Sequence, residues 1–457
     1  MIYLDITRLL NRLKAPSPTG IDRVEFEYAR HALASGWCFV AQDADHIAQM
    51  PTWLAEHVVF HLQHRWERGA EEDPVLEATV QRWRKTIRPK RHGSDTESFF
   101  RDVRSKSFLA RLSVIYRAKY DISKRAPFIP IPLSVLAIAT APALFAYLFT
   151  PKQPPEVPTF RMAPAFRNSV YLNVGHTGLE KTNLMKAVKE RADVRTVIYV
   201  HDLLPITHPA LFPEKDVRNH AIRMRNVKTY ADHIVVNSKF TRDQFEEKYG
   251  AGSVRSVLEI GSLPTVHTPS PVDNNRHGFV TIGTIEPRKN YIWLVKTWLQ
   301  FVQQYPTLVN SERLTIFGKR GWLPDNEKQE LFGLIEGSNN VEIISGSSDE
   351  EVKSRLRSAR AYVTAAEVEG WGMPLAESLS SGTPVIATDI PAHREVTQGH
   401  ARFFLRDYPQ DLCAFLRSCF DVDAYSILTR EVAEFKPWNW QSHFKRLDGV
   451  MRSMPPG

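Results

Sequence analysis

The sequence predicts an α/β fold with two domains, and three observations support this. Short runs typical of buried strands recur along the chain, and a glycine turn and an amphipathic helix follow several of them, as in a parallel sheet with crossover helices. The 457 residues are enough for two domains that each bury a core. Residues 262–277 are rich in proline and polar residues, which is typical of a linker between domains.

The first domain is expected over residues 1–261. A strand is predicted at 3–6, and a loop that ends at Gly20 precedes a helix that stops at Gly36. A second strand is predicted at 37–41. Because the glycine turn places backbone N–H groups at a helix N-terminus, an anion is favoured there.

Two histidines follow further predicted strands of this domain. One strand leads into His176 and Thr177, and the next, at 196–200, leads into His201 and Asp202. Ligands of open α/β sheets bind at the carboxyl ends of the strands. These four residues are therefore candidates for a binding cleft, and a purely structural role for each histidine stays open.

The second domain is expected over 278–425, followed by C-terminal helices at 426–457. Its first strand, at 280–282, leads into a loop that contains Arg288 and Lys289 just before a helix. Two adjacent cations at such a place would neutralise a diphosphate. An exposed basic turn is the alternative interpretation.

The stretch TAAEVEGWGMPLAESLSSGTP joins a predicted strand at 361–364 to a short helix. Gly372 and Pro374 have the spacing of a glycine loop and a helix start, so backbone N–H groups here favour a phosphate. Glu369 and Glu377 flank this anion site, and carboxylates suit the hydroxyls of a sugar or a ribose. A generic loop between strand and helix, with two solvated glutamates, is the alternative.

Residues 82–160 interrupt the α/β pattern. Residues 82–125 hold 14 Lys and Arg against 4 Asp and Glu, which accounts for the formal net charge of +8 on the whole chain. The 23 residues at 127–149 carry no charge, but four prolines weaken a continuous membrane-spanning helix. We expect 82–160 to contact an anionic membrane surface. A buried hairpin or an oligomer contact is the alternative, and the uncharged stretch disfavours nucleic acid as the partner.

Cysteine usage and the N-terminus bear on the compartment. Cys38, Cys413 and Cys419 have no metal-like spacing, which indicates a reducing compartment. The N-terminal run MIYLDITRLL has the pattern of a strand rather than of a secretory signal peptide. No Asp-x-Asp metal motif lies near the candidate anion sites. We therefore expect a cytoplasmic protein that uses neither a metal nor a cofactor.

Several of these motifs together resemble one enzyme family. Glu369-GWGMPLA-Glu377, followed by SGTPVIATDIPAHREV, resembles the E-x7-E motif of the retaining glycosyltransferases of family 4, and GTIEPRKN, NVGHTGL and VHDLLP are also similar to that family. The resemblance covers most of the chain. It implies the GT-B fold, in which two Rossmann-like domains face a central cleft. One departure is that family members more often carry an arginine where this chain has Thr284-Ile285.

The resemblance implies a role for each candidate residue. The diphosphate contact rests on Arg288 and Lys289, Glu377 holds ribose hydroxyls, and Glu369 holds hydroxyls of the transferred sugar without acting as nucleophile. His176 orients the sugar or the acceptor. The implied sets are catalytic Glu369, His176, Lys289 and Arg288; donor-binding Gly20, Arg288, Lys289, Gly318, Gly372, Met373, Pro374, Leu375, Glu369 and Glu377; and acceptor-binding His176, Thr177, His201 and Asp202, with no metal ligand.

The resemblance also implies an activity. A sugar moves from a nucleotide-diphosphate donor to a hydroxyl acceptor with retention at the anomeric carbon and without a metal. Members with sequences like GTIEPRKN often use GDP-mannose or a related GDP-sugar, while UDP- and dTDP-sugars stay open. We expect the acceptor to be a membrane-associated or lipid-linked glycan in bacterial polysaccharide or lipopolysaccharide assembly, met at the inner face of the cytoplasmic membrane. The sequence says nothing about oligomeric state.

Two other function classes stay open at this point. The first is a glycoside hydrolase that uses Glu369 and Glu377 as acid and base, although a hydrolase has no diphosphate for the cationic loop to neutralise. The second is a non-catalytic partner that binds membrane and glycan and keeps a vestigial cleft.

Overall fold

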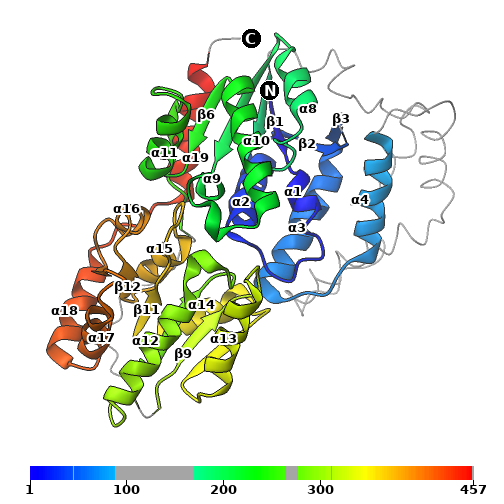
Figure 1. Ribbon diagram of the computed structural model, residues 1–457. Helices are drawn as coiled ribbons and strands as arrows, with labels where there is room; N and C mark the ends of the chain where they lie inside the picture. The colour runs from blue at the N-terminus through cyan, green and yellow to red at the C-terminus, as the bar shows by residue number, and fades with distance from the viewer. Residues whose placement is uncertain (45, 88–168, 263–275, 310, 455–457) are drawn as a thin grey trace.

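The computed structural model describes residues 1–44, 46–87, 169–262, 276–309 and 311–454. These residues form two α/β units, each a sheet with helices packed on it, and the chain passes from one unit to the other near residue 262 (Figure 1). We refer to them as the N-terminal and the C-terminal domain. The predicted α/β fold with two Rossmann-like sheets is confirmed.

The N-terminal sheet has seven strands in the order β3-β2-β1-β4-β5-β6-β7. All neighbours are parallel except β2 and β3, which form an antiparallel pair at the edge. Its strands are β1 (Ile2–Asp5), β2 (Cys38–Asp43), β3 (His46–Met50), β4 (Ser169–Asn173), β5 (Val194–Val200), β6 (His233–Val236) and β7 (Ser256–Val257).

The C-terminal sheet has six parallel strands in the order β10-β9-β8-β11-β12-β13. Counted within the domain, this is the 3-2-1-4-5-6 order of a dinucleotide-binding fold, and the strand order reverses between β8 and β11. The strands are β8 (Phe279–Ile282), β9 (Leu314–Phe317), β10 (Val341–Ile344), β11 (Ala361–Thr364), β12 (Val385–Thr388) and β13 (Arg402–Phe404).

The helices connect and cover these strands. In the N-terminal domain they are α1 (Thr7–Leu10), α2 (Gly20–Ala34), α3 (Thr52–Arg68), α4 (Pro74–Ile87), α8 (Thr182–Lys189), α9 (Leu204–Thr207), η2 (Pro209–Leu211), α10 (Glu214–Tyr230) and α11 (Lys239–Tyr249). Beyond the linker they are η3 (Pro287–Lys289), α12 (Tyr291–Gln304), α13 (Asp325–Glu336), α14 (Asp349–Ser358), α15 (Met373–Ser380), α16 (Pro391–Thr397), α17 (Pro409–Ser418), α18 (Val422–Ala433) and α19 (Trp440–Ser453).

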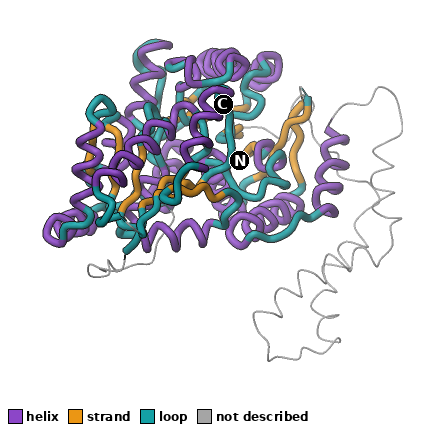
Figure 2. Tube along the Cα trace, turned by 60° about the horizontal axis from the view of Figure 1, so that its bottom comes forward, coloured by secondary structure: helices purple, strands orange, loops and turns teal. Residues whose placement is uncertain are grey.

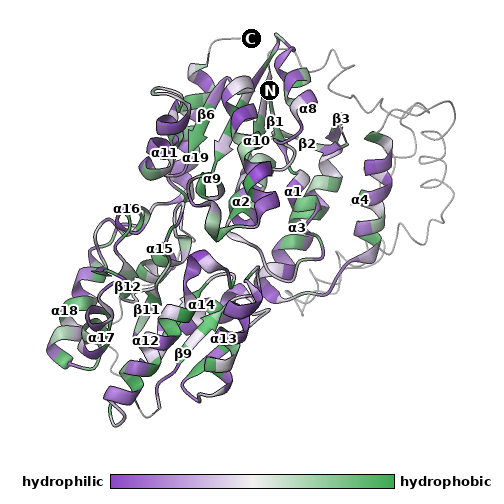
Figure 3. Ribbon diagram, viewed as in Figure 1, coloured by the Kyte–Doolittle hydropathy of each residue, from purple (hydrophilic) through white to green (hydrophobic). Residues whose placement is uncertain are grey.

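The strands are buried on both faces, which explains why their sequences are nearly continuous apolar runs. In β1, Leu4 packs into one apolar cluster and its neighbour Tyr3 into another, because successive side chains point to opposite faces of a sheet. The hydropathy colouring shows hydrophobic residues concentrated on the strands, with hydrophilic residues on the outer helix faces (Figure 3). This layered packing leaves the loops at the strand ends to form the site.

The last helix, α19, returns to the N-terminal domain, and the tube view shows the chain end lying near its start (Figure 2). The Nε2 atom of His443 lies 2.8 Å from the Tyr28 hydroxyl, and its Nδ1 lies 2.8 Å from the carbonyl oxygen of Glu259. The His443 side chain is buried, and both contacts are hydrogen bonds to residues of the N-terminal domain. This helix therefore ties the end of the chain to the first domain.

Two segments with specific predictions fall largely outside the described residues. Residues 82–87 complete α4, whereas the rest of the basic and uncharged region at 82–160 is not described. Of the predicted linker at 262–277, the structure describes Ser262 and residues 276–277. Within the described ranges, no helix combines the length and apolarity needed to cross a bilayer.

Candidate active site

A cavity of about 580 Å³ lies between the two sheets. Residues that follow the carboxyl ends of β1, β4 and β5 line it on one side, and residues that follow β8, β9 and β11 line it on the other. In the C-terminal domain, β8 and β11 flank the point where the strand order reverses, which is where open α/β sheets bind ligands. Figure 1 shows how the loops at these strand ends face one another.

Most of the residues predicted from the sequence line this cavity. They are Gly20, His176, His201, Asp202, Arg288, Lys289, Gly318, Glu369, Gly372, Met373, Pro374 and Glu377. Two predicted contact residues do not line it. Leu375 is buried in an apolar cluster. The carbonyl oxygen of Thr177 accepts hydrogen bonds from side chains behind the cavity wall.

The strongest electrostatic feature is a largely buried cluster of two cations, Arg288 and Lys289, around the acid Glu369, with Glu286 as a second acid against Arg288. Arg288 donates to Glu369 Oε2 at 2.7 Å, and the Lys289 ammonium group contacts Glu369 Oε1. The chain reaches this geometry because Glu367 donates its backbone N–H to the carbonyl oxygen of Arg288 at 2.8 Å, which joins the two loops. Both cations come from η3, which follows β8, and the acid comes from the loop after β11.

Burial and charge act in opposite directions on this cluster. Burial alone raises the pKa of Glu369, but Arg288 and Lys289 outweigh it and bring the pKa to about 2. Burial lowers the pKa of Lys289, which Glu369 partly offsets. The pKa of Arg288 is raised, because Glu369 more than compensates for the burial of the guanidinium group. Arg288 also pairs with Glu286 at 2.9 Å, so the two cations meet two carboxylates and the cluster adds no net positive charge to the cavity when Lys289 is protonated.

The start of α15 supplies further positive potential next to this cluster. Gly372, the N-cap of α15, has φ +91°, a left-handed conformation that glycine adopts without strain. Met373 and Pro374 begin the helix and line the cavity, so backbone N–H groups of its first turn lie at the cavity wall. A phosphate placed here meets both the helix N-terminus and the two cations.

Gly370 brings this loop against the first domain. A Cβ atom built on Gly370 would lie 2.6 Å from the carbonyl oxygen of His201 and 2.8 Å from Cβ of Asp202. On the same side, the Ser238 hydroxyl donates to the carbonyl oxygen of Gly370 at 3.0 Å. Only a residue without a side chain allows this approach between the domains.

Glu377 lies in a different environment from Glu369. Its side chain is half-buried, its buried Oε1 atom has no hydrogen-bond partner among the described residues, and desolvation raises its pKa although Arg23 opposes this. Arg23 belongs to the N-terminal domain and forms a bidentate ion pair across the cavity with Asp349, at 2.8 and 2.5 Å. An unpaired acceptor at the cavity wall fits a ligand hydroxyl as its missing partner.

The N-terminus of α2 lies opposite α15. Thr19 caps α2 in a capping box with Asp22, whose carboxylate accepts the Thr19 N–H at 2.8 Å. A Cβ atom built on Gly20 would lie 3.9 Å from the sulfur of Met373 in the other domain. The predicted glycine turn thus faces the E-x7-E loop across the cavity.

The two predicted histidines are neighbours at the ends of β4 and β5. The ring centroids of His176 and His201 lie 4.9 Å apart, and His220 lies 5.9 Å from His176. Burial, followed by the neighbouring His201, lowers the pKa of His176 well below its usual value, and burial lowers that of His201 to about 4. Both rings are therefore neutral near pH 7, and the Nε2 atom of each lies against a backbone carbonyl oxygen, that of Tyr199 at 3.0 Å for His176 and that of Val174 at 2.7 Å for His201.

The cavity also contains residues that the sequence interpretation did not select. Arg8 follows β1 and is anchored by Asp22 at 2.5 Å, while Trp322 lies in the loop after β9 and is 41% exposed. Neither position carries a pattern that marks it in the sequence. His220 and Arg223, which also line the cavity, lie one turn apart on α10, and only the fold shows which face of that helix reaches the cleft. Among the described side chains, no group of three or more His, Cys, Asp or Glu is arranged to hold a metal ion.

Comparison with known proteins gives a family match for part of the chain. Residues 265–414 match the family described as "Glycosyl transferases group 1". This range covers nearly all of the C-terminal sheet, including the loops that carry Arg288, Lys289, Glu369 and Glu377. It is less than half of the chain.

Curated relatives are similar at low identity. The chain is 25% identical over 236 residues to the serotype-specific mannosyltransferase WbdA of Escherichia coli, an alignment that covers 47% of this chain and 28% of that protein. It is 26% identical over 271 residues to the O-antigen chain mannosyltransferase B of Escherichia coli, covering 54% of this chain and 68% of that protein. The chain thus spans less than a third of the length of WbdA.

Among solved structures, Anabaena Alr3699/HepE in complex with UDP and glucose is similar to this chain with a TM-score of 0.52 and 15% identity. The superposition covers 62% of this chain and 78% of that structure. At this identity the likeness concerns the fold. The chain therefore has the GT-B fold, and its residues 265–414 match the group 1 glycosyl transferases.

Proposed function

We propose that the protein is a glycosyltransferase that moves a sugar from a nucleotide-diphosphate donor to a hydroxyl group of a glycan acceptor. The observation that carries this proposal is the convergence of Arg288, Lys289 and the N-terminus of α15 on one wall of the cavity. When the bond between the anomeric carbon and the diphosphate breaks, negative charge develops on the departing phosphate oxygen. Preorganised positive groups stabilise such charge in a water-poor cavity.

The proposed reaction is retaining and proceeds without a metal. The acceptor oxygen bonds to the anomeric carbon on the face from which the diphosphate departs, and the acceptor proton passes to the departing phosphate oxygen. Arg288 and Lys289 supply the positive charge that the diphosphate requires. Glu369, fixed between the two cations, accepts hydrogen bonds from hydroxyls of the transferred sugar.

The nucleotide lies on the C-terminal domain in this proposal. The unpaired Oε1 of Glu377 accepts a ribose hydroxyl, and Gly318 and the loop at 345–348 flank the base. The acceptor approaches from the N-terminal domain, where His176, His201 and Asp202 line the opposite wall. The neutral imidazoles of His176 and His201 suit an uncharged hydroxyl better than a phosphate.

The proposed sugar is based on the curated relatives, and the proposed membrane-associated acceptor on the charge pattern of the chain. Similarity to mannosyltransferases of O-antigen assembly supports mannose as the transferred sugar. GDP-mannose as its donor is proposed from the resemblance carried by GTIEPRKN. A membrane-associated or lipid-linked glycan is the proposed acceptor, met at the inner face of the cytoplasmic membrane. The basic balance of residues 82–125 supports attraction to an anionic lipid surface.

Two substitutions test the site. Lys289→Ala is expected to lower kcat about 10²- to 10³-fold, because it removes a cation that acts on the developing charge. Glu377→Ala is expected to raise the donor KM with a smaller effect on kcat, because it removes a contact made equally in the ground state. The measurement is transfer from GDP-mannose to a lipid-linked mannoside, with product analysed for anomeric configuration.

The nucleotide of the donor is checked first, by thermal shift with GDP, UDP, dTDP and ADP. Full activity of both variants at subsaturating donor contradicts the site assignment. Cleavage of a glycan in the absence of any nucleotide sugar supports a hydrolase instead, and failure to bind any of the four nucleotides supports a non-catalytic role.

A further inference from the structure

A buried carboxylate lies behind the cavity wall that carries His176. Asp5, the last residue of β1, is 2% exposed, and its Oδ1 accepts hydrogen bonds from the backbone N–H of Thr7 at 2.9 Å and from the Thr7 hydroxyl at 2.5 Å. Its Oδ2 accepts from Gln42 at 2.7 Å, from the Tyr171 hydroxyl at 2.6 Å and from Asn173 at 3.4 Å. Five donors thus converge on one buried carboxylate, which does not itself line the cavity.

This network extends directly to the loop after β4. Asn173 is the strand partner of Asp5, and its Oδ1 accepts the backbone N–H of His176 at 3.1 Å. The carbonyl oxygen of Thr177 accepts from Asn173 at 3.2 Å and from Gln42 at 3.1 Å. Side chains from β2 and β4 therefore hold the backbone at 176–177, and Asp5 of β1, which lies between these strands, binds both of them.

The loop needs this support because of its backbone conformation. His176 has φ +61°, in the left-handed region that strains a residue with a side chain. Gly178, at φ +80°, packs so closely on Gln42 that a Cβ atom would lie 1.7 Å from its Oε1. The hydrogen bonds of Asn173 and Gln42 with the backbone at 176–177 oppose this strain.

We propose that Asp5 and Asn173 are positioning residues that hold the His176 loop in its left-handed conformation and so fix the acceptor side of the cleft. Asp5 orients the Asn173 amide, and Asn173 holds the His176 N–H. This inference rests on the proposed function, in which His176 faces the acceptor or the transferred sugar. In the proposed function the donor is bound mainly by groups of the C-terminal domain, such as Arg288, Lys289 and Glu377, which the network does not contact.

The first test measures the loop itself and needs no substrate. Asn173→Ala removes the acceptor for the His176 N–H. In the wild type each carboxylate oxygen of Asp5 accepts from its own group of donors, and Asp5→Asn replaces one of these oxygens by an NH₂ group, so that a donor faces donors. Both variants are expected to increase amide hydrogen exchange at 174–178 by about tenfold or more, as the loss of about 1.4 kcal/mol of local stability requires. Tyr171→Phe, which removes one hydroxyl donor to Asp5, is the milder variant if the others fold poorly.

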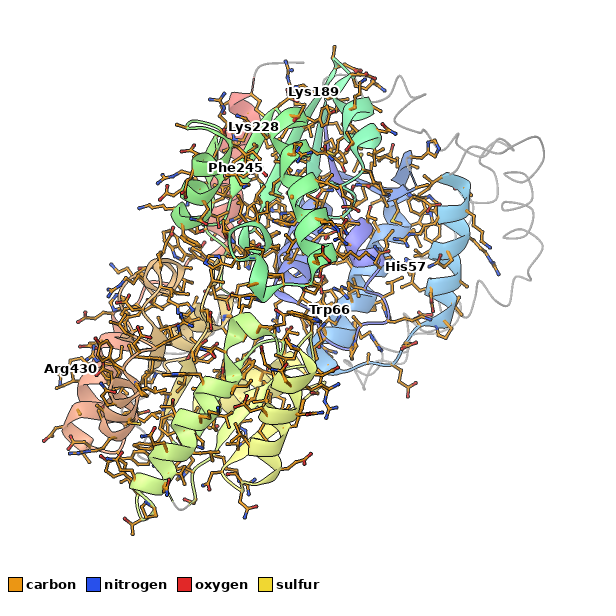
Figure 4. The ribbon with its side chains drawn as sticks, viewed as in Figure 1. His57, Trp66, Lys189, Lys228, Phe245 and Arg430 are labelled. Atoms are coloured by element: carbon orange, nitrogen blue, oxygen red, sulfur yellow. The ribbon has the colours of Figure 1, made fainter. Side chains whose placement is uncertain are left out.

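Phe245→Leu is the matched control for general destabilisation. Phe245 is fully buried on α11 of the N-terminal domain (Figure 4), and it takes no part in the hydrogen bonds to Asp5, Asn173 or residues 176–177 described above. The variant is chosen to lower Tm by a similar amount without touching the network. Exchange at 174–178 that rises equally in Phe245→Leu overturns the positioning role.

The second test separates acceptor from donor. With GDP-mannose and octyl α-mannoside as the assay pair, Asn173→Ala is expected to lower kcat/KM for the mannoside about 10- to 100-fold, while the Kd for GDP stays within about twofold. A parallel loss of GDP affinity overturns the inference, since a local loop effect leaves the C-terminal domain intact.

His176→Ala separates this inference from the proposed function. If His176→Ala leaves the mannoside kinetics unchanged, the proposed acceptor role of His176 fails. If His176→Ala is impaired but Asn173→Ala and Asp5→Asn behave like Phe245→Leu, the positioning inference alone fails.

Discussion

Glu369 and Glu377, at the two ends of the E-x7-E stretch, have opposite pKa shifts. Glu369 meets two cations, which bring its pKa to about 2 against the effect of burial, whereas burial dominates at Glu377 and raises its pKa. The first is therefore a fixed anion already engaged with Arg288 and Lys289. The second is an acceptor without a described partner at Oε1, and the proposed function assigns a ribose hydroxyl to it.

A double-mutant cycle with modified nucleotides tests this difference at the residue scale. The wild-type protein is expected to bind GDP roughly 10- to 100-fold more tightly than 2′,3′-dideoxy-GDP, since a hydrogen bond to a charged group contributes roughly 1.5–3 kcal/mol. Glu377→Ala is expected to lose this discrimination, as measured by titration calorimetry. The control is Glu367→Gln, because Glu367 pairs with Arg406 at 2.6 Å and does not line the cavity. Equal discrimination in Glu377→Ala and the wild type contradicts ribose binding by Glu377.

At the scale of elements, the site consists of loops held by contacts between the domains. The carboxylate of Glu395 on α16 accepts the backbone N–H groups of Lys239 and Phe240 at 2.7 and 3.1 Å, so a side chain of one domain caps α11 of the other. At Gly370 the backbone of the C-terminal domain packs closely against His201 and Asp202 of the N-terminal domain. The positions of the donor and acceptor walls are therefore coupled through the loop after β11.

Gly370→Ala tests this coupling. A methyl group would lie within 2.6 Å of a backbone oxygen, so the loop must move and carry Glu369 with it. We expect kcat to fall about 10²-fold, in line with the cost of a displacement of about 1 Å. The measurement is steady-state transfer together with Tm.

Gly333→Ala is the control for Gly370→Ala. Gly333 lies in α13, and outside its own helical backbone no heavy atom of the described residues lies within 4 Å of the place that a methyl group would take. Alanine in a helix is favoured by roughly 1 kcal/mol over glycine, so this variant should raise Tm and leave kcat unchanged. Unchanged kcat in Gly370→Ala as well would show that the approach between the domains is not needed for the reaction.

At the scale of the whole molecule, buried neutral histidines make stability depend on pH. Burial lowers the pKa of His201, His393 and His443 to about 4, whereas the unfolded chain binds these protons near pH 6.5. Between these values the unfolded state binds more protons, so the free energy of unfolding falls as pH falls from 6.5 to 4. Glu25 and Glu377, whose pKa values burial raises, act in the opposite direction.

His443→Gln isolates one of these contributions. His443 joins α19 to the N-terminal domain, so its protonation weakens the contact that returns the chain to its start. The variant is expected to lose less stability than the wild type between pH 6.5 and 4, by about 3 kcal/mol at most. Denaturant unfolding at a series of pH values measures this, with His57→Gln on the exposed face of α3 as the control (Figure 4). An identical pH dependence in His443→Gln and wild type contradicts the assignment.

The sequence by itself determined the two α/β domains and the loops that form the cleft. Short apolar strands, glycine turns and helix starts are local patterns, and Gly20, Gly372 and Pro374 stand at helix starts because their backbone preferences are local too. The resemblance carried by the E-x7-E stretch added the GT-B arrangement. The roles of Arg288, Lys289, Glu369, Glu377 and His176 stay predictions.

Only the tertiary structure decided which groups meet across strands and domains. The ion pairs of Glu369, the Arg23–Asp349 bridge and the Asp5 network join residues that are far apart in the chain, and no local pattern encodes them. The fold also placed Leu375 in the core and Thr177 behind the wall, since the direction of a side chain depends on what packs beside it. Contacts between strands and between domains, rather than spacing along the chain, determine the ion pairs of the site and the hydrogen bonds that support it.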